Sequence, residues 1–269
     1  MSSLITVITG AAGNLGGGLA VGLARRGHRL ALLDINVDAA RRLAEWLERQ
    51  GHTAVGIGCD VLDPDSVAGA FGEVGGRLGP ATGLVNGAAA FRRKSLQECE
   101  LDEWRRVLAV ILDGAFNCTR SFAAAVESAS VVHAAVVNIG STTAHQGPTG
   151  NIAYATAKAG LLSFTRAAAM DLASSGIRVN SMTPTATDPA EFAARTQELA
   201  AGTDSVTTAR PADGDRRMAA GIPLGALPLP ADYVGAVAFL LGQDSAFVTG
   251  TDLRVDGGAV ARYWDWHAE

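Results

Sequence analysis

The sequence predicts a single α/β domain built on a doubly wound parallel sheet with helices on both faces. Short apolar runs rich in β-branched residues alternate with segments of helical periodicity, which is the pattern of a parallel sheet that is buried on both sides. A glycine-rich turn directly follows the first apolar run, where a strand and the next helix must pass closely. No linker or low-complexity tract interrupts the chain, so residues 1–269 are expected to form one domain.

Seven apolar runs are predicted to be the strands of this sheet. They are Leu4 to Thr9, Arg29 to Leu33, Thr53 to Gly58, Gly83 to Val85, Val131 to Ile139, Ile177 to Met182 and Thr251 to Val255. His133 lies inside the fifth of these runs and is therefore expected to be structural.

Helical patterns lie between the strands. They run from the glycine turn to Arg26, from Val37 to Gln50, from Leu101 to Ser128, from Tyr154 to Ala173 and from Ala231 to Leu241. Asn36 is the candidate N-cap of the second helix, and Gly51 is its candidate stop. Gly72, Gly75, Gly76 and Gly79 are expected in loops or at helix ends.

Composition narrows the class of partner. With 48% hydrophobic and 18% charged residues the chain is too apolar for a disordered protein. A net charge of −5 and a pI of about 5.6 disfavour binding to nucleic acid or to an anionic membrane, and a small molecule is the expected partner. Cys59, Cys99 and Cys118 form no CxxC pair and no metal-ligand spacing. We therefore expect no metal site, reduced thiols and a cytoplasmic protein.

The glycine-rich turn is typical of a dinucleotide site. It reads Thr9-Gly10-Ala11-Ala12-Gly13-Asn14-Leu15-Gly16, follows a strand and opens a helix. Glycines allow positive φ and close approach of the backbone to a pyrophosphate, and the N-terminus of the following helix faces the phosphates. The expected pyrophosphate contacts are therefore Gly10, Gly13, Asn14, Leu15 and Gly16.

Asp34 ends the second strand and indicates which dinucleotide is bound. A carboxylate at this point accepts hydrogen bonds from the ribose hydroxyls of the adenosine half and repels a 2′-phosphate. NAD is accordingly expected rather than NADP, with Ile35 as a neighbouring contact. The alternative is that Asp34 caps the next helix.

Ser141, Tyr154 and Lys158 form the candidate catalytic set. Tyr154 and Lys158 lie four residues apart on one predicted helix and so share a face, and Ser141 follows a strand 13 residues before Tyr154. An ammonium group favours the phenolate, and lowering the pKa of Tyr154 by ~3 units from its ordinary value near 10 corresponds to ~4 kcal/mol. A lysine and an oxidised nicotinamide can supply that together.

With these motifs in place, the chain resembles the short-chain dehydrogenase/reductase family in its single-domain form. The resemblance covers nearly the whole chain. Its further motifs are Asp60-Val61, Asn86-Gly87-Ala88-Ala89, Arg178-Val179-Asn180 with Pro184, and Thr249-Gly250 through Asp256-Gly257-Gly258. It implies a Rossmann-type seven-stranded sheet that binds NAD and a homotetramer or homodimer.

The resemblance also implies residue roles. Tyr154 would be the general acid and base, Lys158 would lower its pKa and hold the nicotinamide ribose, and Ser141 would orient the carbonyl or hydroxyl. Asp60 and Val61 would flank the adenine. The remaining implied cofactor contacts are Asn86, Pro184 and Thr187, of which Thr187 would lie near the carboxamide.

The chain departs from the family pattern at four places. Gly13 stands one residue earlier than the middle glycine of compact members, and Asn86-Gly87-Ala88-Ala89 replaces the usual NNAG. The asparagine expected on the long central helix is Ile111, which removes the usual amide from the proton path. Thr185 replaces the glycine after Pro184, and Pro189 replaces a later threonine.

Several segments are candidates for substrate binding. The stretch from Thr185 to Leu229 is too long for an ordinary connection and is expected to be a substrate-binding loop, whose composition favours a polar substrate. His145 and Gln146 follow Ser141 and either contact such a substrate or lie in solvent. The other candidates are Arg92, Arg93 and Lys94, which either recognise an anion or are simply solvated.

The sequence thus predicts an NAD-dependent oxidoreductase that interconverts a secondary alcohol and a ketone. One alternative keeps the fold and the bound NAD but catalyses net non-redox chemistry, such as elimination or epimerisation. Another is a dinucleotide-sensing protein without catalysis. Trp264 and Trp266 lie in the tail 259–269, which is expected to pack in a homo-oligomer or, alternatively, to close a neighbouring subunit's pocket.

Overall fold

The computed structural model describes residues 4–188 and 219–262, and these form a seven-stranded parallel sheet in the order β3-β2-β1-β4-β5-β6-β7. The strands are β1 (Ile5–Thr9), β2 (Arg29–Asp34), β3 (Ala54–Gly58), β4 (Gly83–Asn86), β5 (Ala134–Ile139), β6 (Ile177–Pro184) and β7 (Asp252–Val255). The predicted doubly wound sheet is confirmed. Strand order reverses between β1 and β4, and ligands bind at the carboxyl ends of strands beside such a switch point.

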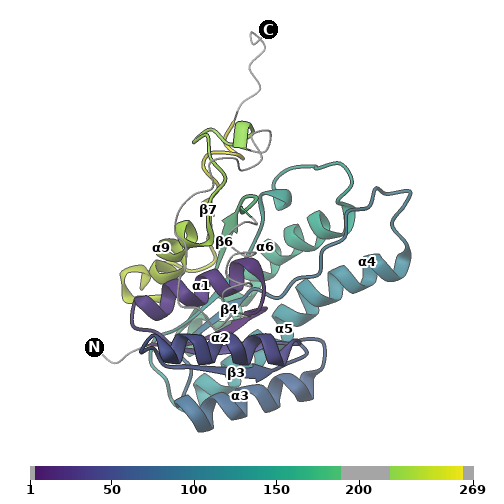
Figure 1. Cartoon of the computed structure of the whole chain (residues 1–269). Coiled ribbons are helices and arrows are strands. Elements are labelled where there is room, and N and C mark those ends of the chain that lie inside the picture. The colour runs from purple at the N-terminus through teal and green to yellow at the C-terminus, as the bar shows by residue number, and fades with distance from the viewer. Residues whose placement is uncertain (1–3, 189–218, 263–269) are drawn as a thin grey trace.

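Helices cover both faces of the sheet (Figure 1). One layer packs over a core cluster that contains Ile8 and Leu32 and consists of α1 (Asn14–Arg25), α2 (Val37–Arg49) and α9 (Pro230–Leu241). The other packs over a cluster that contains Val136 and Phe122 and consists of α3 (Pro64–Leu78), α5 (Gly114–Ser128) and α6 (Ile152–Leu172). Burial of both faces explains why the strands are almost continuously apolar.

Local signals place most helix ends as expected. The Asn36 side chain accepts a hydrogen bond from the Ala39 amide at 3.1 Å and caps α2, and Gly51 follows that helix with a φ of +83°. Gly79 ends α3 with a φ of +97°.

The expectation for Gly72, Gly75 and Gly76 was wrong, because all three lie inside α3. The buried face of this helix, which includes Phe71 and Val74, outweighs the low helix propensity of glycine.

The predicted helix from Leu101 to Ser128 is one continuous helical stretch with an irregular centre. It comprises α4 (Leu101–Leu108), the π-helical segment η1 (Ala109–Asp113) and α5. Its length and a mean hydropathy of 1.2 over 18 residues would suffice to cross a membrane, but half of that window is buried inside the fold. Phe122 and Val107 are almost completely buried, as in a core helix.

The fifth strand is shorter than predicted, since it begins at Ala134 rather than at Val131. His133 precedes the strand, is exposed and has a φ of +72°, so its expected place inside the strand was wrong. The pattern of apolar residues does not show where the backbone leaves the extended conformation. The positive φ of His133 therefore could not be predicted from hydropathy.

Candidate active site

The glycine turn after β1 is compact because its glycines allow the backbone to fold onto itself. Gly10 has a φ of +66°, and a Cβ there would lie 2.8 Å from the Ala88 Cα. A Cβ on Gly16 would overlap the Gly10 carbonyl oxygen. The Gly13 amide donates to that same oxygen at 3.1 Å and closes the turn. The first amides of α1 therefore lie at the switch point, as a pyrophosphate site requires.

The departure from the usual motif at Gly87 has a packing reason. A Cβ on Gly87 would lie 2.8 Å from the Thr9 carbonyl oxygen. The Thr9 hydroxyl accepts hydrogen bonds from the Gly87 amide at 3.1 Å and the Ala88 amide at 3.2 Å. These contacts hold the end of β4 against the end of β1, so the glycine permits the close approach of the two strand ends.

A cavity of about 210 Å³ lies beside this turn. Five of the predicted cofactor residues line it together, namely Gly10, Asp34, Ile35, Asp60 and Val61. The Asn117 side chain on α5 donates to the Val61 carbonyl oxygen at 3.0 Å and fixes that wall. The lining, with a carboxylate at the end of β2, is what a site for the adenosine half of a dinucleotide requires.

Asp34 organises the β2 side of this cavity. One carboxylate oxygen accepts from the Ala12 amide at 2.9 Å, and the other accepts from the Asn36 amide at 2.9 Å. The alternative role as cap of α2 was wrong, because Asn36 is the cap. Each carboxylate oxygen can accept a second hydrogen bond, so capacity for ribose hydroxyls remains.

Asn86 lies in a buried polar chain. Its side-chain nitrogen donates to the Thr119 hydroxyl at 3.0 Å and to the Asn138 side-chain oxygen at 2.8 Å. Asn138 in turn donates to the Thr165 hydroxyl at 2.9 Å. The chain links β4 and β5 to α5 and α6, and no local sequence pattern indicated Asn138 or Thr165. Among the described atoms the Asn86 side-chain oxygen has no partner.

The structure brings Ser141, Tyr154 and Lys158 together at the carboxyl end of β5. Ser141 begins the short 3₁₀ turn η2 (Thr142–Ala144), and its hydroxyl accepts from the Thr143 amide at 3.2 Å. Ser141 also forms a side-chain hydrogen bond with Tyr154. Lys158 is 2% exposed, and its ammonium donates to the Ile139 carbonyl oxygen at 2.6 Å.

Burial dominates the electrostatics of these groups. It raises the pKa of Tyr154 to about 12, and the hydrogen bond with Ser141 opposes that shift. Burial lowers the pKa of Lys158 to about 8. The Lys158 nitrogen lies 5.5 Å from the centroid of the Tyr154 ring. Ser141 and Lys158 by themselves therefore do not produce the predicted lowering of the Tyr154 pKa. That lowering requires a further positive charge at the site.

Ile111 occupies the family's asparagine position as a core residue. It is 2% exposed and packs with Ala115, Ala157 and Leu161 between the central helix and α6. Ile111 lies in the π-helical segment, so the helix is irregular at this position. The side chain there is apolar and cannot supply the amide of the usual proton path.

The other predicted cofactor residues line the far side of the switch point. Pro184 ends β6, and the Thr187 hydroxyl lies 3.4 Å from both the Thr185 carbonyl oxygen and the Tyr233 hydroxyl. The Asn14 side chain donates to the Asp188 carbonyl oxygen at 3.4 Å, and Leu15 packs on the core beneath α1. Pro189, residues 189–218 of the expected substrate-binding loop, Trp264 and Trp266 lie outside the described residues.

His145 and Gln146 bond to the protein itself. The His145 side chain bonds to Asp252 at 2.9 Å, and the Gln146 side chain donates to the Ala259 carbonyl oxygen at 3.1 Å. Phe91, which no sequence pattern indicated, makes an edge-on contact with Tyr154 at 5.0 Å between ring centroids. This contact brings the segment that carries Arg92, Arg93 and Lys94 beside the candidate catalytic tyrosine.

Comparison with known proteins adds four likenesses. A family model described as enoyl-(acyl carrier protein) reductase matches residues 10–260. The chain is 34% identical to cis-4-hydroxycyclohexanecarboxylate dehydrogenase from Sinomonas cyclohexanicum, over 96% of each chain. It superposes on a crystal structure of NAD⁺-bound xylitol dehydrogenase with a TM-score of 0.82 and 31% identity, covering 95% of this chain and 98% of that one.

A second solved structure carries the other dinucleotide. A gluconate 5-dehydrogenase from Burkholderia cenocepacia in complex with NADP and tartrate superposes with a TM-score of 0.84 and 27% identity, over 98% of this chain and 97% of that one.

Proposed function

The chain belongs to the short-chain dehydrogenase/reductase family, and from that premise we propose that it is an NAD-dependent oxidoreductase that interconverts a secondary alcohol and a ketone. The observation that carries the proposal is that Ser141, Tyr154 and the buried Lys158 meet at the carboxyl end of β5, on the same edge of the sheet as the glycine turn and the cavity lined by Asp34. Named relatives are dehydrogenases and reductases, which supports an oxidoreductase of this family in general.

Each member of the set has a chemical task. NAD, when bound, accepts or returns the hydride and brings positive charge to the site. Tyr154 takes the proton from the alcohol or returns it to the ketone oxygen, while the Ser141 hydroxyl orients that oxygen. Lys158 holds its ammonium near the tyrosine ring and the end of β5, where it binds the nicotinamide ribose and favours the phenolate.

Asp34 supports NAD as the preferred dinucleotide. Its carboxylate lines the cavity and has acceptor capacity left for ribose hydroxyls, whereas a 2′-phosphate would meet a negative charge there. The remaining proposed contacts are Gly10, Gly13, Asn14, Leu15, Gly16, Ile35, Asp60, Val61, Asn86, Pro184 and Thr187.

The substrate we propose is a small hydroxylated carboxylate. The Phe91 ring contacts Tyr154, and Arg92 is the next residue in the chain, so a cationic side chain is carried by the segment beside the proposed catalytic tyrosine. Within residues 4–188 and 219–262, Arg92, Arg93 and Lys94 form no salt bridge with a carboxylate. The relative from Sinomonas is named for a cyclic hydroxy acid, which agrees with an anionic, polar substrate.

A panel of alcohols tests this function. We expect NAD, more than NADP, to be reduced with ring-hydroxylated carboxylates, as followed by absorbance at the NADH band, and the neutral cyclic alcohols of the same size to react less well. Arg92→Gln should raise KM for the carboxylates only, whereas Arg49→Gln at the end of α2 should change nothing. Equal loss for neutral and anionic alcohols in Arg92→Gln would contradict the substrate class.

A second candidate function keeps the same site. Ile111 and Thr185 replace residues of the usual proton path and nicotinamide end, which favours net non-redox chemistry such as elimination or epimerisation. Product formation without net NADH change would support this alternative. Binding of NADH without turnover across the whole panel would instead support a dinucleotide sensor.

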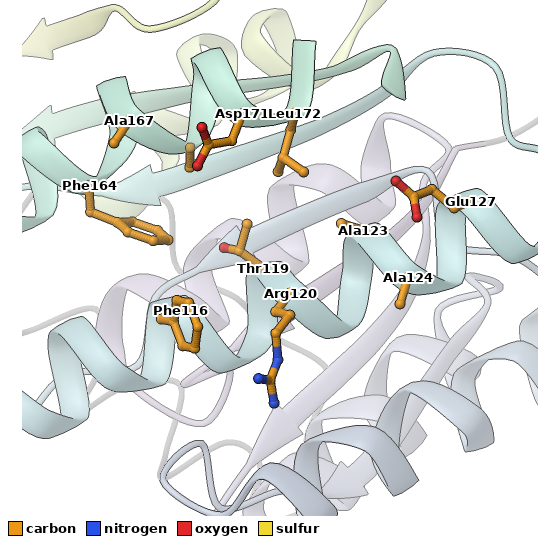
Figure 2. A pocket seen from close by; sticks show the side chains of 11 residues that line it. Phe116, Thr119, Arg120, Ala123, Ala124, Glu127, Phe164, Ala167, Asp171 and Leu172 are labelled. Carbon is orange, nitrogen blue, oxygen red and sulfur yellow. The ribbon is translucent and has the colours of Figure 1, made fainter. Parts of the chain in front are cut away.

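We also propose that the protein is a homo-oligomer of the cytoplasm. An apolar groove of about 570 Å³ runs between α5 and α6, with Phe116 on one helix and Phe164 on the other (Figure 2). The groove is lined by one basic residue, Arg120, and by two acidic residues, Glu127 and Asp171. In a dimer with a two-fold axis, the basic residue of one copy can therefore lie opposite an acidic residue of the other. The proposed substrate-binding loop (185–229) and the tail (259–269) would complete the pocket and the interface.

A further inference from the structure

Asp252 forms hydrogen bonds with three side chains, two from β6 and one from the loop that follows β5. One carboxylate oxygen accepts from the Ser181 hydroxyl at 2.6 Å and the Thr183 hydroxyl at 2.8 Å, both on the neighbouring strand β6. The other oxygen bonds to the His145 ring nitrogen Nε2 at 2.9 Å. Because an ionised carboxylate only accepts, Nε2 of His145 must carry the hydrogen. The carboxylate is mostly buried, with 18% of the side chain exposed.

Two of these donors flank the loop that carries Ser141. His145 ends the turn η2, which Ser141 begins. On the other flank, Gly140 donates its amide to the Met182 carbonyl oxygen at 2.8 Å, and a Cβ on Gly140 would lie 2.5 Å from the Thr183 hydroxyl. On one flank of the Ser141 loop His145 bonds to Asp252 directly, and on the other Thr183, which also bonds to Asp252, packs closely against Gly140.

From this arrangement we infer that Asp252 and His145 are positioning residues that fix the Ser141 hydroxyl for its hydrogen bond with Tyr154. The inference rests on the proposed function, because it assigns their effect to the candidate catalytic serine. Asp252 is 111 positions from Ser141 in the sequence, and β7 is the edge strand of the sheet. A charged side chain on an edge strand usually faces solvent. Asp252 is instead mostly buried and hydrogen-bonded within the protein, which indicates a structural role for it.

The segment after β7 also contacts the loop that carries Ser141 and His145. The Gln146 side chain donates to the Ala259 carbonyl oxygen, and Asp256 accepts from the Gly258 and Val260 amides at 2.9 Å each, which shapes that segment. The adenosine cavity lies on the β1–β2 side of the sheet. Loosening Asp252 should therefore change turnover while leaving binding of the dinucleotide intact.

The first test uses kinetics of the full-length enzyme. Asp252→Ala should lower kcat by about 10-fold to 100-fold, the usual result of displacing a catalytic group slightly, with little change in the Kd for NADH. His145→Ala should lose somewhat less, and His145→Gln should recover most of the activity because its amide nitrogen can donate to the carboxylate. Glu73→Gln is the matched control, since it removes a 2.9 Å bond to Arg77 on the remote helix α3.

A double-mutant cycle shows whether the effect passes through Ser141. In the Ser141→Ala background, Asp252→Ala should cause no further loss of kcat, since the hydroxyl that it positions is gone. Equal losses in both backgrounds, or a full kcat in Asp252→Ala, would overturn the inference. Loss of NADH binding together with kcat would overturn it as well.

Hydrogen exchange supplies a readout that does not depend on turnover. The Thr143 amide donates to the Ser141 hydroxyl, so Asp252→Ala should increase exchange in the peptide that covers residues 141–146, and Glu73→Gln should not. Unchanged exchange there would overturn the inference. If the wild-type enzyme shows no turnover with any alcohol, the proposed function fails, whereas the exchange measurement still tests the support of the loop.

Discussion

At the scale of single residues, the pKa values of Lys158 and Tyr154 are shifted in opposite directions. Lys158 is buried and Tyr154 is partly buried, and the loss of hydration lowers the pKa of the ammonium and raises the pKa of the phenol. The Lys158 ammonium keeps one strong acceptor, the Ile139 carbonyl oxygen. The phenolate is therefore costly without a further positive charge, and under the proposed function the oxidised nicotinamide supplies that charge.

The buried lysine predicts how stability depends on pH. Its pKa is about 8 in the folded protein and 10.5 in the unfolded chain, so between these values the unfolded chain binds a proton that the folded one lacks, and stability rises with pH. Urea unfolding should show wild type gaining about 2 kcal/mol over Lys158→Met between pH 8 and 9.5. Tyr154 contributes only above pH 10. Parallel curves for the two proteins would contradict the burial of a titrating lysine.

At the scale of elements, the backbone of the turn between β1 and α1 shapes the proposed dinucleotide site. Gly16 has no room for a side chain, because a Cβ would overlap the Gly10 carbonyl oxygen. Gly72 in α3 is the opposite case, since it is exposed and a Cβ there would meet nothing within 4 Å. Two glycines in helices of one protein thus carry different constraints.

Alanine substitution should separate these two glycines. Gly16→Ala should lower the affinity for NADH at least 10-fold and lower Tm, because the turn must open. Gly72→Ala should raise the free energy of unfolding by about 1 kcal/mol through lower backbone entropy in the unfolded chain, with NADH affinity unchanged. Titration calorimetry and thermal unfolding give both numbers. Equal NADH affinity in the two variants would remove the turn from the binding site.

Sequence reasoning succeeds where the signal is local. The Asn36 cap, the Gly51 stop and the alternation of strands and helices follow from short-range preferences and hydrophobic periodicity. The spacing of Tyr154 and Lys158 places them on one helix face for the same reason. The predicted site roles remain predictions, although the structure brings their residues to one edge of the sheet.

Sequence reasoning fails where the contact is long-range. The bond between His145 and Asp252 spans 107 positions, and the bond between Asn86 and Asn138 spans 52, so neither leaves a periodic signal. The glycines of α3 are helical because the core face of that helix decides, and the π-helical segment around Ile111 depends on packing against α6. These features depend on which elements meet in the folded chain.

At the scale of the whole molecule, the groove between α5 and α6 predicts self-association. Phe116 is 49% exposed there and has the Arg120 guanidinium over its ring at 5.4 Å. Phe116→Glu should shift the sedimentation profile toward the monomer, because a carboxylate would be buried in an apolar interface. Phe247→Glu is the matched control, since Phe247 is fully exposed and lines a different cavity. An unchanged profile for Phe116→Glu would exclude this face.

The layers of the fold place the proposed binding and catalytic residues at different strand ends. The strand ends of β1 and β2 and the segment after β3 line the cavity proposed for the adenosine half, whereas the ends of β5 and β6 carry Ser141 and Pro184. Thr9 joins these halves through the Gly87 and Ala88 amides at the switch point. If these roles hold, a variant should be able to lose dinucleotide binding or catalysis while keeping the other.

Replacement of Tyr154 by phenylalanine tests the central claim most directly. The substitution removes only the hydroxyl that exchanges the proton, and the ring keeps its contacts with Phe91 and Lys158. With the best alcohol of the panel and NAD, Tyr154→Phe should show no turnover at the NADH band while binding NADH with near wild-type affinity in a fluorescence titration. Turnover that survives in Tyr154→Phe at a rate close to wild type would contradict the assignment of Tyr154 as the general acid and base.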